Sequence, residues 1–353
     1  MKTIINTNFV KNLAFAALAL ISVSAFAQEE EEEAPKFSFS GSVDAYYRAN
    51  LTAPNDEEAI APGSSFANLP GFSLGMANLV AAYEGDKVGF VADLVFGPRG
   101  TDAVFASPMY SMTGDIINQL YVYWNVSDDV TLTFGNFNTF LGYEVISPVA
   151  NFNYSTSYLF SYGPFSHTGL KADFDLGNDW SAMLAVMNPT DLTEFNPTGD
   201  YAVGAQLGYS GQFLNFVYSQ SSYEIDFTGG FDVSEDFFLG INAAHFSADD
   251  NAGSFTGVAL YPQLATSENF TIGLRGEYFM TGDFFGDSAG IGFDADGDAS
   301  VLALTLTGSA TIGDLILKPE IRLDSTSEDA FIDSDLAPTA SLASVLFAAI
   351  YSF

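Results

Sequence analysis

The sequence predicts a transmembrane antiparallel β-barrel, an all-β fold that crosses a membrane with strands. Three observations predict it: segments of alternating apolar and polar residues, seven short polar turns between pairs of segments, and longer loops between the other pairs. Alternation turns one face of each strand towards lipid and the other towards water. Because hydrocarbon satisfies no backbone N–H or C=O, a spanning sheet must close on itself.

The expected barrel has sixteen strands, with fourteen or eighteen as alternatives because some early segments alternate weakly. An even number is typical of bacterial single-chain barrels, and seven short turns with eight longer loops place both termini on the short-turn side. The expected strands are 37–50, 72–84, 87–97, 115–126, 130–140, 167–176, 180–188, 200–210, 212–221, 223–232, 237–247, 254–265, 270–281, 299–310, 314–324 and 339–353.

The segment 270–281 shows the alternation clearly. Leu274 and Tyr278 fall on one face, and Arg275 and Glu277 fall on the other. This period of two predicts a strand that separates lipid from a polar interior.

The chain divides into three parts. Residues 1–27 resemble a cleaved signal peptide, with an amino-terminal region carrying Lys2 and Lys11, a short apolar run and an Ala-Phe-Ala cleavage site. Residues 28–36 form an acidic periplasmic spacer, and residues 37–353 form the barrel. The leader predicts export, and with the barrel pattern it predicts the outer membrane of a Gram-negative bacterium.

The composition excludes several functional classes. Lys and Arg number 10 against 44 Asp and Glu, and the formal net charge is −34. This acidity argues against binding of DNA or RNA, which needs a basic surface. With no cysteine and only two histidines, we expect no structured metal site, no cofactor and no catalytic residues.

A loop at residues 141–166 is unlike the others, because it is rich in aromatic and amide side chains and carries one charge. Aromatic rings avoid bulk water, so we expect this third long loop to fold into the lumen and narrow it. Packing on the rim or against a neighbouring subunit is the alternative. The expected constriction residues are Tyr143, Glu144, Asn151, Asn153, Tyr154, Ser155, Ser157 and Tyr158.

Alternation points a few charges into the barrel. The expected wall charges are Arg48, Lys171, Asp173, Arg275 and Glu277, with Lys318 and Arg322 closer to a periplasmic turn. Acids and bases facing one another across a constriction would set a transverse field that filters ions. The alternative is that the bases pair with inward acids and hold the wall together, and this is favoured for the last two.

The last strand ends in an aromatic residue. Phe347, Tyr351 and Phe353 share one face. This pattern resembles the signal that the barrel-assembly machinery of Gram-negative bacteria reads.

Two further patterns are weaker. Asp294-Ala-Asp-Gly-Asp298 resembles the opening of a calcium loop but lacks its later Gly and Glu, so a solvated loop is favoured. His245 and Ser247 share a face, as a histidine-activated serine would require, but no orienting partner is evident nearby. Neither pattern changes the expectation of a non-enzymatic barrel.

One stretch resembles a known family. Gly135-Asn136-Phe137, Gly142-Tyr143-Glu144, Asn153-Tyr154-Ser155, Gly163-Pro164-Phe165 and His167-Thr168-Gly169 are similar to the β-barrel porin-2 family, the OmpL-like group. The resemblance implies an outer-membrane, porin-like barrel but no particular solute. With the inward loop, the leading hypothesis is a channel for passive diffusion of small polar or ionic solutes, and the acid excess favours cations. A closed structural or surface-interaction barrel is the alternative. Expected partners are outer-membrane lipid, the assembly machinery, the solutes and, in a homo-oligomer, further copies of the chain.

Overall fold

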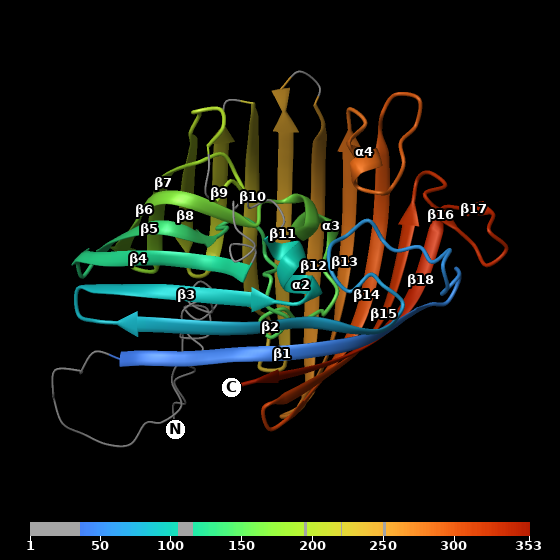
Figure 1. Ribbon diagram of the computed structural model, residues 1–353, viewed down its shortest axis with the longest axis horizontal. Coiled ribbons are helices and arrows are strands. Elements are labelled where there is room, and N and C mark those ends of the chain that lie inside the picture. The colour runs from blue at the N-terminus through green and yellow to red at the C-terminus, as the bar shows by residue number, and fades with distance from the viewer. Residues whose placement is uncertain (1–35, 105–115, 194–195, 220, 250–251) are drawn as a thin grey trace.

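Sixteen antiparallel strands form a closed barrel in the computed structural model, which describes residues 36–104, 116–193, 196–219, 221–249 and 252–353. Each strand pairs with its neighbours along the chain, and β18 closes the barrel against β1 (Figure 1). The expected fold class and strand number are confirmed.

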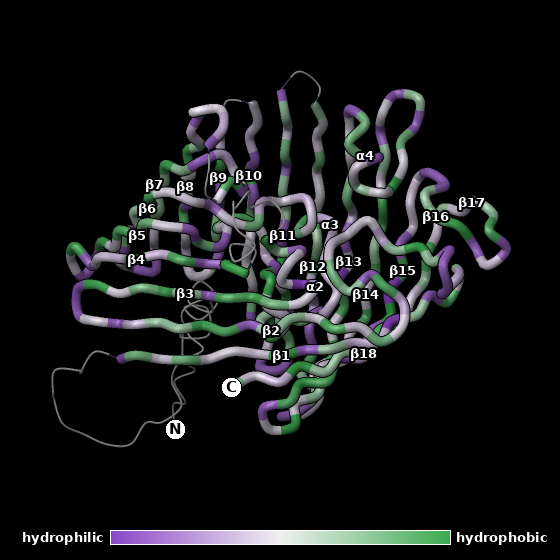
Figure 2. The backbone as a smooth tube through the Cα atoms, viewed as in Figure 1, coloured by the Kyte–Doolittle hydropathy of each residue, from purple (hydrophilic) through white to green (hydrophobic). Residues whose placement is uncertain are grey.

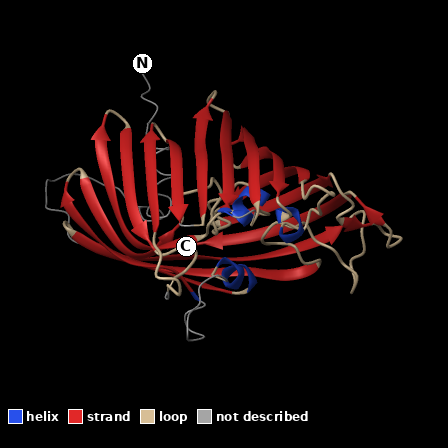
Figure 3. Cartoon of the chain, turned by 90° about the horizontal axis from the view of Figure 1, so that it is seen from above, coloured by secondary structure: helices blue, strands red, loops and turns tan. Residues whose placement is uncertain are grey.

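The strands follow the predicted segments to within a few residues. Inside the barrel lie segments of the longer loops, with short helices among them (Figure 3). The barrel strands are β1 (Lys36–Asn50), β2 (Gly71–Glu84), β3 (Val88–Phe96), β4 (Ile117–Ser127), β5 (Val130–Asn138), β6 (Ser166–Gly177), β7 (Trp180–Met187), β8 (Ala202–Tyr209), β9 (Gln212–Ser219), β10 (Ser222–Asp232), β11 (Phe237–Ala248), β12 (Ser254–Ser267), β13 (Phe270–Gly282), β14 (Ala299–Ile312), β15 (Leu315–Thr326) and β18 (Ser341–Ser352). The other elements are α2 (Pro98–Ala103), α3 (Tyr158–Tyr162), α4 (Phe285–Ser288) and the small hairpin of β16 (Phe331–Ile332) and β17 (Pro338–Thr339).

Side chains alternate between the two faces of the barrel as predicted. In β13, Leu274 and Tyr278 are 39% and 43% exposed, whereas Arg275 and Glu277 are fully buried. Hydrophobic residues are distributed along the strands, and the turn between β2 and β3 is polar (Figure 2). The outer face therefore suits lipid, and the charged groups point inwards.

The barrel closes between its first and last strands. Gly41 and Phe353 exchange two backbone hydrogen bonds of 3.0 Å, and the ring of Phe353 lies 6.1 Å from that of Phe39. Phe347 and Tyr351 lie on the outer face of β18, about half exposed. Their recognition by the assembly machinery stays a prediction. The predicted signal peptide and nearly all of the acidic spacer lie outside the described residues.

The connections agree with the predicted asymmetry except at one place. All seven short turns are present. A short connection also occurs on the other side, where β9 ends at Ser219 and β10 begins at Ser222, in keeping with the expected strand bounds of 212–221 and 223–232. The hydroxyls of Ser219 and Ser222 lie 2.9 Å apart and stabilise this tight hairpin.

Among the described residues, no helix has the length and apolar character needed to cross a membrane.

Gly135 offers a test of the barrel wall. Its φ of 140° is one that residues with a Cβ avoid, and an added Cβ would lie 2.3 Å from the carbonyl oxygen of Leu120. We expect Gly135→Ala to lower the free energy of unfolding by about 1–3 kcal/mol. Urea titration followed by tryptophan fluorescence measures it. Gly276→Ala is the matched control, because its Cβ would meet only Leu304 at 3.7 Å; equal stability of both variants would contradict the argument.

Candidate functional site

Loop 3, residues 139–165, leaves β5 and returns into β6, but its hydrogen-bond partners lie largely on β13, β14 and β15. These strands are well separated from β5 and β6 in the strand order of the barrel. The loop backbone is irregular, so its N–H and C=O groups need partners wherever water is excluded. Inward side chains of the strands provide many of these partners.

Glu277 of β13 holds the start of α3. Its carboxylate accepts hydrogen bonds from the backbone N–H groups of Tyr158 at 2.9 Å and Leu159 at 2.7 Å. The Ser157 hydroxyl accepts from the N–H of Phe160 at 3.0 Å and caps the same helix. A carboxylate and a hydroxyl thus satisfy free N–H groups at the first turn of α3.

Glu320 of β15 holds the segment that precedes α3. It accepts hydrogen bonds from the N–H groups of Tyr154 at 3.0 Å and Ser155 at 3.3 Å, and from the Thr307 hydroxyl at 2.8 Å. The Asn153 amide donates to the same Thr307 hydroxyl at 2.7 Å. Two neighbouring strands therefore fix three consecutive loop residues.

Arg275 binds the carbonyl side of loop 3. Its guanidinium forms a salt bridge of 2.7 Å with Glu144 and donates to the carbonyl oxygens of Ser155 at 2.5 Å and Thr156 at 3.1 Å. It also donates to the Thr305 hydroxyl at 3.1 Å. Arg275 and Glu144 are both buried, so this pair is shielded from solvent.

Two further cations of β15 bind loop carbonyls. Lys318 donates to the carbonyl oxygen of Pro148 at 2.8 Å and to that of Asn151. Arg322 donates to the carbonyl oxygen of Thr156 at 3.0 Å and forms a salt bridge of 2.8 Å with Asp324. Carboxylates of the wall thus accept from loop N–H groups while its cations donate to loop C=O groups.

The predicted loop tyrosines are anchored at their hydroxyls. Tyr154 donates to Asp44 of β1, and Tyr158 donates to Asp324 of β15 at 3.1 Å. Both side chains are fully buried, and burial raises the pKa of each phenol above its usual range. The tyrosines are therefore neutral hydrogen-bond donors at the wall.

The remaining predicted loop residues act within the loop or on another strand. The Tyr143 ring stacks on Tyr261 of β12 with centroids 4.4 Å apart. The Ser157 hydroxyl donates to Glu144, and the Asn151 amide bonds the loop backbone at residue 145. The structure therefore gives each predicted loop residue a partner within the loop or on the wall.

The loop acid lies beside a wall base, which favours the pairing alternative over a transverse field at this point. Glu144 and Arg275 are joined directly, so they do not face each other across water. Lys171 and Asp173 of β6 form a second pair at 2.9 Å, with Lys171 over the Phe137 ring at 5.6 Å, and this pair is partly exposed. These charges are thus paired at close range and do not form rows of acids and bases that face one another across the channel.

Sequence reasoning missed the contribution of other loops. Arg99 of α2 donates to the carbonyl oxygens of Ile146 at 2.8 Å and Tyr154 at 3.0 Å. Arg48, which was predicted to point inwards, donates to the carbonyl oxygen of Asn68 in loop 1, residues 51–70, at 2.9 Å. The signal in the sequence for Arg99 was that the chain has few cations. An arginine inside a loop of such an acidic chain is expected to bind acceptor groups nearby.

Asp191 fixes the end of loop 3. Its carboxylate, from the loop between β7 and β8, accepts from the N–H groups of Phe165 and Ser166, both at 2.8 Å. Burial raises the pKa of Asp191 to about 6, although these two hydrogen bonds oppose the shift.

The two weaker sequence patterns form other arrangements. The Asp294 carboxylate accepts from the N–H groups of Asp296 and Asp298 and thus closes its own turn. His245 lies within hydrogen-bond distance of Thr256, at 2.8 Å, and of Tyr223, at 3.3 Å. Among the described residues, no group of three or more His, Asp or Glu side chains is placed to hold a metal ion.

Removing Arg275 tests the network. We expect Arg275→Gln to lower the free energy of unfolding by about 3–5 kcal/mol, because it leaves Glu144 buried without its partner. Lys171→Gln is the matched control, and its partly exposed pair predicts a loss of about 1 kcal/mol or less. Urea titration of the refolded barrel measures both, and similar losses would show that the Arg275 pair is not specially stabilising.

Asp191 predicts a pH dependence. Its folded-state pKa lies above the unfolded value, so its contribution to stability is full below about pH 4 and is lost as the pH rises through about 6. We expect Asp191→Asn to remove this loss. Between pH 4 and pH 7, the free energy of unfolding of the variant should rise by about 1–3 kcal/mol relative to that of the wild type. A difference that stays constant over this range would contradict the assignment.

A family model described as "Putative beta-barrel porin-2, OmpL-like" matches residues 36–353. No curated protein matches the sequence.

Three solved structures share the fold. The outer membrane channel DcaP of Acinetobacter baumannii is 14% identical with a TM-score of 0.57, and the match covers 93% of this chain and 100% of DcaP. OmpF of Salmonella typhi is 10% identical with a TM-score of 0.60, covering 90% and 97%. An anion-selective porin from Comamonas acidovorans is 11% identical with a TM-score of 0.52, covering 91% and 100%.

At these identities the structural likeness establishes the fold alone. The family match spans the whole barrel, from the first described residue to the last. The chain therefore belongs to the OmpL-like β-barrel porin-2 family.

Proposed function

We propose that the protein is an outer-membrane porin through which small polar or ionic solutes diffuse passively, with loop 3 as its constriction. The observation that carries this proposal is the attachment of loop 3 to inward charged side chains of β13 and β15. A loop held in this way occupies part of the lumen and leaves solutes the remainder. The polar inner face and the porin family support the same function.

The proposed channel prefers cations. Asp and Glu outnumber Lys and Arg by 44 to 10, and several of the cations are already engaged by loop 3 or by acids of the wall. The fixed charge left for solutes is therefore acidic. The likeness to an anion-selective porin concerns the fold and does not determine this sign.

A closed structural barrel is the second candidate. Arg275, Glu277 and Thr305 are fully buried, so loop 3 leaves no solvent at this part of the wall. A barrel filled throughout in this way would expose its loops as the functional surface and pass no solute.

Planar-bilayer recording of the refolded mature chain tests the proposal. We expect stable single-channel steps and a cation-selective reversal potential in a KCl gradient. An anion-selective potential would overturn the cation preference but keep the porin. The absence of steps from a verified, inserted barrel would favour the closed candidate.

Loop deletion tests the constriction. Replacing residues 149–162 by a short Gly-Ser linker should raise the conductance, because the linker cannot reach the wall charges. Deleting 197–199 in the exposed loop between β7 and β8 is the control and should leave conductance unchanged. Equal conductance of the two folded variants would show that loop 3 does not constrict the channel.

A further inference from the structure

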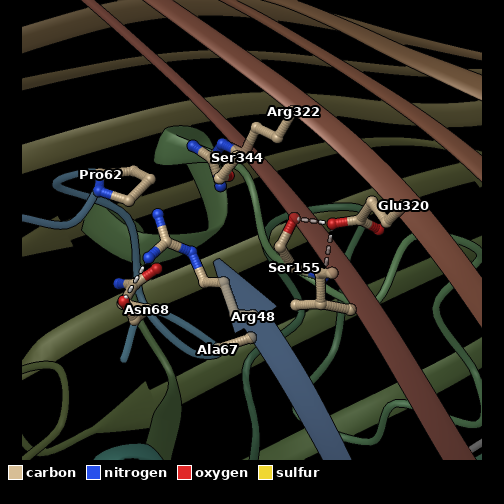
Figure 4. A pocket seen from close by; sticks show the side chains of 9 residues that line it. Arg48, Pro62, Ala67, Asn68, Ser155, Glu320, Arg322 and Ser344 are labelled. Atoms are coloured by element: carbon tan, nitrogen blue, oxygen red, sulfur yellow. Dashed lines mark hydrogen bonds between the residues drawn. The ribbon is translucent and has the colours of Figure 1, made fainter. Parts of the chain in front are cut away.

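A small cavity, with room for about one water-sized molecule, lies where loop 1 and loop 3 meet β1, β15 and β18. Arg48 of β1 and Arg322 of β15 both line it, with Asn68 of loop 1, Ser155 of loop 3 and Ser344 of β18 (Figure 4). Both arginines are almost completely buried, at 2% and 3% exposure. Two buried guanidinium groups and the carboxylate of Glu320 thus line one small space, together with apolar side chains.

Arg48 has donors to spare. It donates from Nη1 to the carbonyl oxygen of Asn68 at 2.9 Å and from Nη2 to the Asn50 side chain at 2.8 Å. A guanidinium carries five N–H groups, so about three of them, Nε–H included, have no hydrogen-bond acceptor among the described residues. Both acceptors are neutral, and no described carboxylate forms a salt bridge with Arg48.

The nearby acids are already engaged. Asp324 accepts from Nε and Nη2 of Arg322, and it also accepts from the Tyr158 hydroxyl. Glu320 accepts from two loop N–H groups and from the Ser155 and Thr307 hydroxyls. These acids leave the charge of Arg48 without a paired anion.

We propose that a small monovalent anion, of the size of a halide, binds in this cavity between Arg48 and Arg322. A buried cation is costly without a counter-charge, and guanidinium N–H groups form strong charge-assisted hydrogen bonds with anions. The hydroxyl of Ser344 offers a further donor. The bound anion links loop 1, loop 3 and the barrel wall. This structural role goes beyond the proposed permeation, and the bound ion has the opposite charge to the cations that the proposed channel prefers.

Anion-dependent stability tests the site in solution. The midpoint of thermal unfolding of the refolded full barrel is measured while chloride replaces gluconate at constant ionic strength and pH. Because chloride fits the cavity and gluconate does not, we expect the wild-type midpoint to rise and saturate with chloride. Arg48→Gln should abolish this rise. Lys171→Gln, which alters a paired cation of another strand, should retain it.

A crystal soaked in bromide provides a second measurement that needs no variant. We expect an anomalous peak within hydrogen-bond distance of both guanidinium groups. A wild-type midpoint that is equal in chloride and gluconate would overturn the proposal, and a bromide peak without a solution effect would show binding at crystal concentration only. A saturating rise that Arg48→Gln retains would place the anion elsewhere and overturn it too.

Discussion

The constraint on which this structure depends is the need to satisfy the polar backbone of loop 3 inside the barrel. A strand finds its hydrogen bonds in the neighbouring strand, but an irregular loop has no such ladder. The wall supplies the missing partners in two kinds. Glu277 and Glu320 accept from loop N–H groups, and Arg275, Lys318 and Arg322 donate to loop C=O groups. The inward charges of β13 and β15 are therefore explained by the loop they hold.

This use of charge changes how the interior should be understood. A charged side chain that binds both backbone groups and an oppositely charged side chain contributes little electric field at the position of a passing solute. The Arg275–Glu144 and Arg322–Asp324 pairs are of this kind, since each lies within about 3 Å and is shielded from water. In the proposed channel, selectivity then depends on charges that remain exposed.

The sequence predicted local features well and distant partners poorly. Strand bounds, turns and the two faces follow from a period of two and from turn residues, which neighbouring positions reveal. The hairpin between Ser219 and Ser222 departs from the pattern of long loops on this side, although the expected strand bounds already placed the two strands almost end to end. Glu277 was predicted to point inwards, but its partner Tyr158 is 119 residues away. Only closure of the barrel brings such residues together.

The fold of the barrel and the polarity of its interior therefore depend on different residues. Sequence identity of 10–14% suffices for the same fold, because alternation and turns can be met by many side chains. The polarity of the interior depends on the few inward cations and on the acceptor groups or counter-charges that neutralise each of them. Most of these neutralising groups come from the chain itself, whereas Arg48 has only neutral acceptors. A difference of one charge at such a position therefore alters the interior without altering any strand.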